Sequence, residues 1–444
     1  MTEKDSTPDL DALGAKCQDV PMDKGARVLV VSSPSPPAVM ASALLCRSIM
    51  KAKGFFHVTF IEPVSSSEVL ASIMNTNPER TTIVLGIDIT GNGTLDSKRS
   101  PLILIGSTIQ KKHTSCYSLG SKTSVPASAY AFAREKMETG PEELFLGAAA
   151  LLIQNQQMIE SDPASKDVIR LAQATDILQE RRGFRIFGAN FLPLSETLSN
   201  SISPYLRGIS GAPESCERVL SEADIPSARR NVPITSLTSE EKKRLTEKLA
   251  LQLDISVIRK LLGLDFETRL EPESSPMHFL SGIQSMAEVA WCRQEVGLAM
   301  AIWMGDRARM MRMLLDSYRI HCKGTISGVQ HFLSVQVKHE IRALSDLVSI
   351  APLAGVSTEV LPDVGRIAIE NGHIDKERFL VLEKDDYACV VWASEDVTLS
   401  DVLTAFDTAG LSPLSTSTTS VLVPLTSKEN RETLLKVVDT LPRG

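Results

Sequence analysis

The chain has 444 residues, of which 43% are hydrophobic and 23% charged, as in soluble globular proteins of more than one domain. The formal net charge is −7, which excludes a global positive field that would draw the whole molecule onto nucleic acid, although a local basic groove stays open. The 7 cysteines are scattered without a Cys-x-x-Cys pair, so we expect reduced, mostly buried thiols and no metal or other cofactor.

The N-terminal stretch, residues 1–24, is predicted to be a loose polar tail. It lacks the apolar core of a signal peptide. No apolar run in the chain approaches the roughly 18–20 residues that span a bilayer. We therefore expect a cytoplasmic protein with no membrane contact.

Residues 25–190 are predicted to form an α/β domain. Apolar runs at 27–32, 56–63, 80–89 and 100–107 read as strands, and 38–54 and 65–76 read as helices between them. Continuous Val, Ile and Leu runs separated by helices are typical of a parallel sheet that is covered on both faces.

The remainder is predicted to contain a mainly helical connecting region, 191–345, and a smaller α/β domain, 346–444. Thr238 and Glu241 have the spacing of a capping box at the start of a helix. The apolar segment 296–306 fits either a helix or a buried strand. Strand signals return in the last hundred residues, with a helix predicted at 398–410.

Six segments in this order resemble the DHH phosphoesterase superfamily, in its archaeal RecJ-like and cell division cycle protein 45-like branch. They are "RVLVVSSPSPPAVMASALL" (27–45), "VLGIDITGNGTL" (84–95), "LILIGSTIQ" (102–110), "DILQERRGFRIFG" (176–188), "ISPYLRGISG" (202–211) and "WMGDRARMMRMLLDSYR" (303–319). The resemblance implies a parallel-sheet DHH-type domain followed by a DHH-associated-type C-terminal domain.

The resemblance also implies a site for two divalent metals, which generate a hydroxide and neutralise a phosphoryl oxygen. At its ligand positions, this chain carries residues that supply no carboxylate or imidazole. Ser33 replaces a histidine, Ser35 and Pro37 replace two aspartates, Gly106, Ser107 and Thr108 replace the Asp-His-His triplet, and Leu151 stands near the fourth carboxylate. Asp88 alone is retained.

The family's Gly-Gly-Gly-His substrate loop corresponds to residues 408–420, where only Gly410 remains. With the metal ligands and this loop both missing, we expect a pseudo-nuclease. The resemblance implies a scaffold or accessory role in archaeal DNA replication, in which the chain binds the GINS complex and supports the MCM replicative helicase. Binding of single-stranded DNA is possible, and the acidic net charge and the missing loop predict that it is weak or absent.

Two arginine clusters carry alternative interpretations. Arg181, Arg182 and Arg185 either contact nucleic-acid phosphates or decorate the C-terminus of a helix that precedes a core strand. Arg307, Arg309 and Arg312 either form a docking face or belong to a helix that buries its methionines. His331 and His339 are eight residues apart on a predicted helix, about 12 Å, which is too far for one metal.

Two alternative functions stay open. One is a divergent metal-dependent single-strand exonuclease or phosphoesterase that recruits metal through Asp88 and a nearby carboxylate such as Asp96. The other is a regulatory partner of an active RecJ-like nuclease. The sequence does not fix the oligomeric state or the surface that binds a partner.

Overall fold

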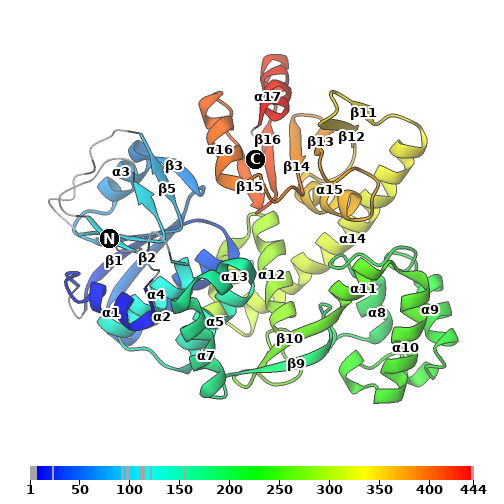
Figure 1. Cartoon of the computed structure of the whole chain (residues 1–444), viewed down its shortest axis with the longest axis horizontal. Coiled ribbons are helices and arrows are strands. Elements are labelled where there is room, and N and C mark those ends of the chain that lie inside the picture. The colour runs from blue at the N-terminus through cyan, green and yellow to red at the C-terminus, as the bar shows by residue number, and fades with distance from the viewer. Residues whose placement is uncertain are drawn as a thin grey trace, which may run out of the picture. The chain divides into compact units, whose positions relative to one another are not determined.

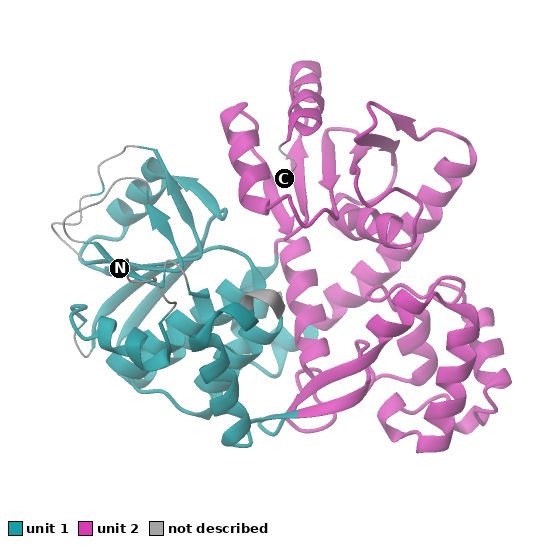
Figure 2. Cartoon of the chain, in the orientation of Figure 1, with its two compact units in different colours: residues 1–179, 268–270, 295–312 teal, residues 180–267, 271–294, 313–444 magenta. Residues whose placement is uncertain are grey.

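The computed structural model describes residues 8–22, 25–91, 95, 101–109, 116–120, 123–154 and 156–441. The chain divides into two compact units (Figure 2). Unit 1 comprises residues 1–179, 268–270 and 295–312, and unit 2 comprises 180–267, 271–294 and 313–444. The predicted domain ranges divide the chain more finely, and they stay predictions.

Unit 1 is built on a five-stranded parallel sheet in the order β2-β1-β4-β6-β8, of which Figure 1 labels β1 and β2. Its strands are β1 (Arg27–Ser32), β2 (Phe55–Phe60), β4 (Thr81–Leu85), β6 (Leu102–Ile105) and β8 (Cys116–Leu119). Every neighbouring pair in this sheet is parallel. The α/β class predicted from the apolar runs is therefore confirmed.

Beyond β2, β4 and β6, the chain forms a second, three-stranded parallel sheet. It consists of β3 (Val64–Ser66), β5 (Asp88–Thr90) and β7 (Thr108–Ile109), in the order β3-β5-β7. The predicted strand 80–89 is thus two strands, because the backbone turns between them at Gly86, whose φ of 62° suits glycine. Gly106, with φ 54°, makes the same turn between β6 and β7.

Helices complete unit 1. They are α1 (Leu10–Cys17), α2 (Pro36–Lys51), α3 (Ser67–Thr76), α4 (Val125–Lys136), α5 (Pro141–Leu152), α6 (Gln156–Ser161), α7 (Pro163–Ala174) and α13 (Val296–Trp303). Helix α1 lies within the predicted polar tail and buries Leu10, Leu13 and Cys17, so the described part of this range is packed rather than loose. Segment 296–306, left open between helix and strand, contains helix α13.

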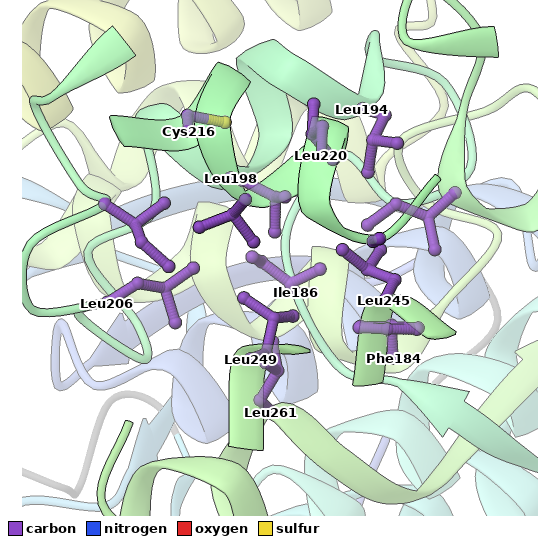
Figure 3. Packing of buried hydrophobic residues seen from close by; sticks show 14 of the residues in the cluster. Phe184, Ile186, Leu194, Leu198, Leu206, Cys216, Leu220, Leu245, Leu249 and Leu261 are labelled. Atoms are coloured by element: carbon purple, nitrogen blue, oxygen red, sulfur yellow. The ribbon is translucent and has the colours of Figure 1, made fainter. Parts of the chain in front are cut away.

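The helical part of unit 2 surrounds the apolar cluster shown in Figure 3, to which Phe184, Leu198, Leu220, Leu249 and Leu261 belong. Its elements are β9 (Leu178–Phe184), α8 (Leu194–Ser199), α9 (Pro213–Glu222), the 3₁₀ turns η1 (Ser227–Arg229) and η2 (Ile234–Ser236), α10 (Ser239–Gln252), α11 (Ile255–Leu261) and β10 (Leu262–Thr268). The capping box is confirmed: Glu241 N–H donates to Thr238 Oγ1 over 3.2 Å, and Thr238 N–H donates to Glu241 Oε2 over 2.8 Å.

Residues 178–184 form strand β9, whereas the sequence favoured a helix that continued through them. Helix α7 ends at Ala174, where Asp176 takes a left-handed φ of 59° and Ile177 N–H returns to Ala172 O over 2.9 Å. Such a helix terminus turns the chain out of the helical path. Arg181 and Arg182 therefore lie on a strand, and the prediction of a helix end decorated with arginines is wrong.

The C-terminal part of unit 2 is a six-stranded mixed sheet in the order β11-β12-β13-β14-β16-β15 (Figure 1). Its strands are β11 (Arg342–Ala343), β12 (Val348–Pro352), β13 (Phe379–Lys384), β14 (Tyr387–Val391), β15 (Leu414–Ser417) and β16 (Ser420–Pro424). The helical elements of this part of the chain are α12 (Leu280–Cys292), α14 (Arg309–Val337), η3 (Thr358–Val360), α15 (Leu361–Glu370), α16 (Leu399–Thr408) and α17 (Lys428–Thr440). The predicted C-terminal α/β fold is confirmed.

Segment 408–420, predicted as a loop, contains β15 and the first residue of β16. Ser415 of this segment accepts a hydrogen bond from Trp291 Nε1 over 3.3 Å. In this segment, the side chain of Ser415 is therefore buried against Trp291 of α12. None of the helices in the described residues is long and apolar enough to cross a membrane.

Candidate functional site

The candidate site lies at the carboxyl ends of the parallel strands of unit 1. Just beyond these ends, backbone hydrogen bonds join Ser33 N–H to Leu85 O (3.0 Å), Gly86 N–H to Ile105 O (3.1 Å) and Gly106 N–H to Leu119 O (3.0 Å). The structure thus brings the first and third sequence motifs to one sheet edge. This edge is where open α/β sheets bind their ligands.

The turn after β1 uses its hydroxyls internally. Ser33 is buried, and its Oγ lies 2.9 Å from Ser35 Oγ. Helix α2 then begins at Pro36, with Pro37 in its first turn, where a missing N–H costs no hydrogen bond. The turn keeps a rigid shape and offers two paired hydroxyls in place of histidine and carboxylate ligands.

Ser107 connects the two sheets of unit 1. Its Oγ accepts from Ile87 N–H over 3.0 Å and lies 3.2 Å from the carbonyl oxygens of Val84 and Ile105. Its side chain is therefore engaged with the backbone on both sides of the turn. Next to it, Thr108 Oγ1 donates to Asp88 Oδ1 over 2.6 Å, so the carboxylate of Asp88 is bound to a hydroxyl at a position where the resemblance implies a triplet residue.

Apolar groups pack against the same edge. A Cβ atom added at Gly106 would lie 2.5 Å from Val125 Cγ2 and 3.2 Å from Val125 Cα, at the start of helix α4. A Cβ atom at Gly86 would lie 3.3 Å from Ser33 Oγ and 3.4 Å from Val125 Cγ2. Helix α4 therefore approaches too closely for an aspartate at position 106 without rearrangement.

Leu151, at the position of the fourth expected carboxylate, is fully buried on α5. The buried carboxylate of this helix is Glu143, eight residues earlier and about 12 Å away along the axis. Glu143 accepts from Arg47 Nε over 3.0 Å, from Lys51 Nζ over 2.5 Å and from Gly140 N–H over 2.7 Å. Sequence reasoning missed it, although its place as the third residue of a Pro-initiated helix marks it as a capping residue.

Burial alone would raise the pKa of Glu143, but the hydrogen bonds from Lys51, Gly140 N–H and Arg47 outweigh that effect. The pKa is therefore lowered from 4.5. Glu143 is a charged structural group in the helical layer, away from the strand ends.

The residues at the strand ends do not fit a pair of divalent metals. Such a pair needs several carboxylate or imidazole donors, whereas the described side chains at the expected ligand positions beyond β1, β4 and β6 are hydroxyls, glycine, proline and one carboxylate. Two further carboxylates lie nearby but outside those positions: Glu62 follows β2, and the buried Asp162 accepts from Ser124 N–H over 3.2 Å. Over the described residues, the one group of three or more His, Cys, Asp or Glu that could hold a metal is Cys292, His321 and Asp363, in unit 2. Asp96 lies outside the described residues.

The predicted cluster of Arg181, Arg182 and Arg185 is divided by strand geometry, because neighbouring residues on β9 face opposite sides. The Arg181 guanidinium lies 3.9 Å from the centroid of the Phe279 ring, and its nitrogens lie 3.9 Å from carboxylate oxygens of Asp265 and Glu267. Burial lowers the pKa of Arg181 despite these two acids. Arg182 is exposed and Arg185 is half-buried.

Arg307, Arg309 and Arg312 are all exposed, around the start of α14. Arg307 Nη1 donates to Ile302 O. Of the neighbouring methionines, Met311 is 6% exposed and Met313 is 43% exposed. The helix thus buries one methionine and leaves the other in solvent. His331 and His339 are exposed as well.

The group Cys292, His321 and Asp363 was not predicted. Its members come from α12, α14 and α15, separated by 29 and 42 residues in the sequence. No local spacing rule could connect them, since only the packing of the three helices brings them together.

No family model matches the sequence, and no curated protein matches it. Solved structures do match. The crystal structure of CDC45 from Entamoeba histolytica superposes with a TM-score of 0.63 at 11% identity, over 97% of this chain and 98% of that one. RecJ in complex with Mn²⁺ from Thermus thermophilus gives a TM-score of 0.50 at 11% identity, over 98% of this chain and 55% of that one. The chain therefore has the CDC45- and RecJ-like DHH fold, as its sequence motifs predicted.

Proposed function

We propose that this chain is a catalytically inactive RecJ-like protein that acts as a scaffold or accessory factor of an archaeal replisome in the cytoplasm. In this role, it binds the GINS complex and supports the MCM replicative helicase. The observation that carries the proposal is the sheet edge of unit 1, where paired hydroxyls and Val125 occupy the place of the expected metal ligands.

The comparison with CDC45 supports a replication role, because the match runs through nearly the full length of both chains. The partners come from the resemblance found in the sequence. The net charge of −7 and the segment 408–420, with its single retained glycine, favour protein partners over tight binding of single-stranded DNA.

A second candidate is a divergent nuclease, and the observation that favours it is the retained Asp88. Its carboxylate is half-exposed at the correct sheet edge, next to Thr108. One carboxylate and neutral hydroxyls bind divalent metals poorly, so this candidate needs further carboxylates such as Asp96.

Two measurements on the full chain test the proposal. The first is Mn²⁺-dependent release of nucleotides from single-stranded DNA or RNA, with Asp88→Ala as the test variant and Asp11→Ala, whose side chain is 91% exposed, as the control. We expect no metal-dependent release from any of the three proteins. Robust release that disappears in Asp88→Ala but persists in Asp11→Ala would overturn inactivity.

The second measurement is co-purification from native extract. We expect GINS subunits to be recovered, together with MCM subunits at lower yield. Recovery of an active RecJ-like nuclease without GINS would replace the replisome role with regulation of that nuclease.

A further inference from the structure

Three helical elements of unit 2 meet closely around Cys292, His321 and Asp363. A Cβ atom added at Gly328 would lie 2.6 Å from Val364 Cγ2, and one at Gly324 would lie 3.1 Å from Val360 Cγ1. These two glycines, one turn apart, let helix α14 approach η3 and α15 at short range. His321, on the preceding turn of α14, is thereby placed against Asp363 of α15.

The contacts among the three side chains are short. His321 Nε2 lies 2.7 Å from Asp363 Oδ2, and Cys292 Sγ donates to Glu359 O over 3.1 Å, which fixes the end of α12 against η3. One ligand atom from each of Cys292, His321 and Asp363 lies within 4.8 Å of the other two. His321 is fully buried and Cys292 is 7% exposed, whereas the Asp363 side chain keeps 18% exposure, which gives an ion a route from solvent.

The polar groups of α14 at this place are incompletely satisfied. His321 Nδ1 and, one turn along, Thr325 Oγ1 are buried and have no hydrogen-bond partner. A buried polar atom without a partner costs about 1–3 kcal/mol. An ion bound through Nε2 would leave both atoms as they are, so the case for the ion rests on the three ligand atoms.

Charged side chains of α15 surround the three residues. Arg366 holds Asp363 Oδ1 through Nη2 (2.6 Å) and Nε (2.9 Å), so Oδ2 is the oxygen that faces His321. Glu370 accepts from the other side of Arg366 over 3.1 Å. Lys260 Nζ lies 2.9 Å from Glu370 Oε1, so these two charges offset each other. Asp363 and a Cys292 thiolate would then offset two of the three positive charges of Arg366 and a divalent ion.

We propose that Cys292, His321 and Asp363 bind a divalent transition metal of the Zn²⁺ type, which links helices α12, α14 and α15. Thiolate, imidazole and carboxylate together form a donor set that suits Zn²⁺ and disfavours Mg²⁺ or Mn²⁺. This inference is independent of the proposed replisome role, and it departs from the sequence expectation of no metal.

Metal binding requires small, defined movements. Zn–ligand bonds of about 2.0–2.3 Å place tetrahedral donors roughly 3.2–3.8 Å apart. The ion therefore replaces the proton between His321 and Asp363, opens that contact slightly and draws the Cys292 sulfur inward.

Burial raises the pKa of the Cys292 thiol well above its ordinary value, so the metal-free thiol carries its proton. The thiolate forms only as the metal binds, and the S–H proton passes to solvent.

The test uses the full chain, freed of metal with a chelator and titrated with Co²⁺ or Zn²⁺ alone. We expect one equivalent of Co²⁺ to bind with a thiolate-to-cobalt charge-transfer band, Zn²⁺ to displace it, and Zn²⁺ to raise the Tm. Cys292→Ser and His321→Gln should lose the band and the rise in Tm. Cys216→Ser is the matched control, because Cys216 is also buried in unit 2 and also donates to a backbone carbonyl, that of Ser195.

Three results would overturn the proposal: no binding to the folded wild-type chain, a band that persists in Cys292→Ser, or a band that Cys216→Ser also removes. Circular dichroism of the metal-free variants separates loss of the site from loss of folding. If Cys292→Ser does not fold, His321→Gln decides, since glutamine can keep a hydrogen bond to Asp363.

Discussion

The strand ends of unit 1 and the contact of α12, α14 and α15 in unit 2 bury polar side chains in opposite ways. The strand ends have the topology of a metal site, but their described side chains are mostly hydroxyls bonded to one another and to the backbone. The helix contact has no topological reason to hold a metal, yet it gathers a thiol, an imidazole and a carboxylate.

The difference shows that architecture and donor chemistry can separate within one chain. A parallel sheet directs its carboxyl ends to one edge whatever residues follow the strands. Metal binding also requires donor atoms with the right charge and room for the ion. At Gly106, both are missing, because no donor is present and Val125 fills the space.

A large effect on stability is expected from loss of the carboxylate in the helix contact. Asp363→Ala leaves Arg366 with Glu370 as its remaining carboxylate and His321 without a partner at Nε2, so we expect a loss of about 3 kcal/mol in the free energy of unfolding. Asp88→Ala, at the half-exposed strand end, should cost about 1 kcal/mol or less. Urea denaturation in the presence of a chelator measures both, and equal losses would erase the contrast between the two regions.

A buried carboxylate that is unrelated to either site provides a reference. Glu143→Ala removes the shared partner of Arg47 and Lys51, and we expect it to cost about 3–5 kcal/mol. Glu142→Ala is the matched control: its side chain is 51% exposed and lies 3.8 Å from the same two cations, so its loss should cost at most about 1 kcal/mol. Thermal and urea unfolding compare the two, and similar losses would contradict the assignment of Glu143 as the buried anchor.

The same residue gives a pH dependence with a defined sign. Because the pKa of Glu143 is lower in the folded state, its contribution is complete above the ordinary value of 4.5 and is lost as the pH falls through the folded pKa. The difference in stability between wild type and Glu143→Gln should therefore shrink below about pH 4. A difference that grows on acidification would show that the carboxyl is protonated in the folded protein.

An attempt to restore a ligand at the strand ends should also destabilise the protein. Gly106→Asp places a Cβ atom 2.5 Å from Val125 Cγ2 at a φ of 54°, so we expect a loss on the order of 3 kcal/mol and no gain of Mn²⁺-dependent nuclease activity. Gly355→Asp, with φ 81° and no atom within 4 Å of the added Cβ, should cost about 1 kcal/mol.

The double variant Gly106→Asp with Val125→Ala separates crowding from backbone strain. Removing the two methyl groups should recover part of the stability lost in Gly106→Asp. If the double variant loses more free energy of unfolding than the two single variants lose together, Val125 is not the obstacle at this edge.

The sequence predicted four of the five strands of the main sheet of unit 1, because buried parallel strands appear as continuous apolar runs such as 27–32 and 102–105. It missed β8 (Cys116–Leu119), which is short and includes polar residues. It did not predict the breaks at Gly86 and Gly106, since a left-handed φ leaves no periodic signal. It also missed β9, because residues 178–184 alternate polar and apolar side chains only weakly. In addition, no proline between α7 and β9 marks the end of the helix in the sequence. The metal-binding group of unit 2 depends on tertiary packing at Gly324 and Gly328, which no local pattern encodes.

The smallest expected effect concerns the arginines of β9. Arg182 is exposed on the strand, so Arg182→Ala should change stability by no more than about 0.5 kcal/mol. Arg181 packs on Phe279 beside two acids, and Arg181→Ala should cost about 1–2 kcal/mol.

Because the side chains of Arg181 and Arg182 point to opposite faces of β9, they cannot contact one phosphate together. We therefore expect wild type and Arg182→Ala to bind a fluorescent single-stranded oligonucleotide equally weakly at physiological salt. A clear loss of affinity in Arg182→Ala, with a salt slope reduced by about one, would instead establish this strand face as a nucleic-acid contact.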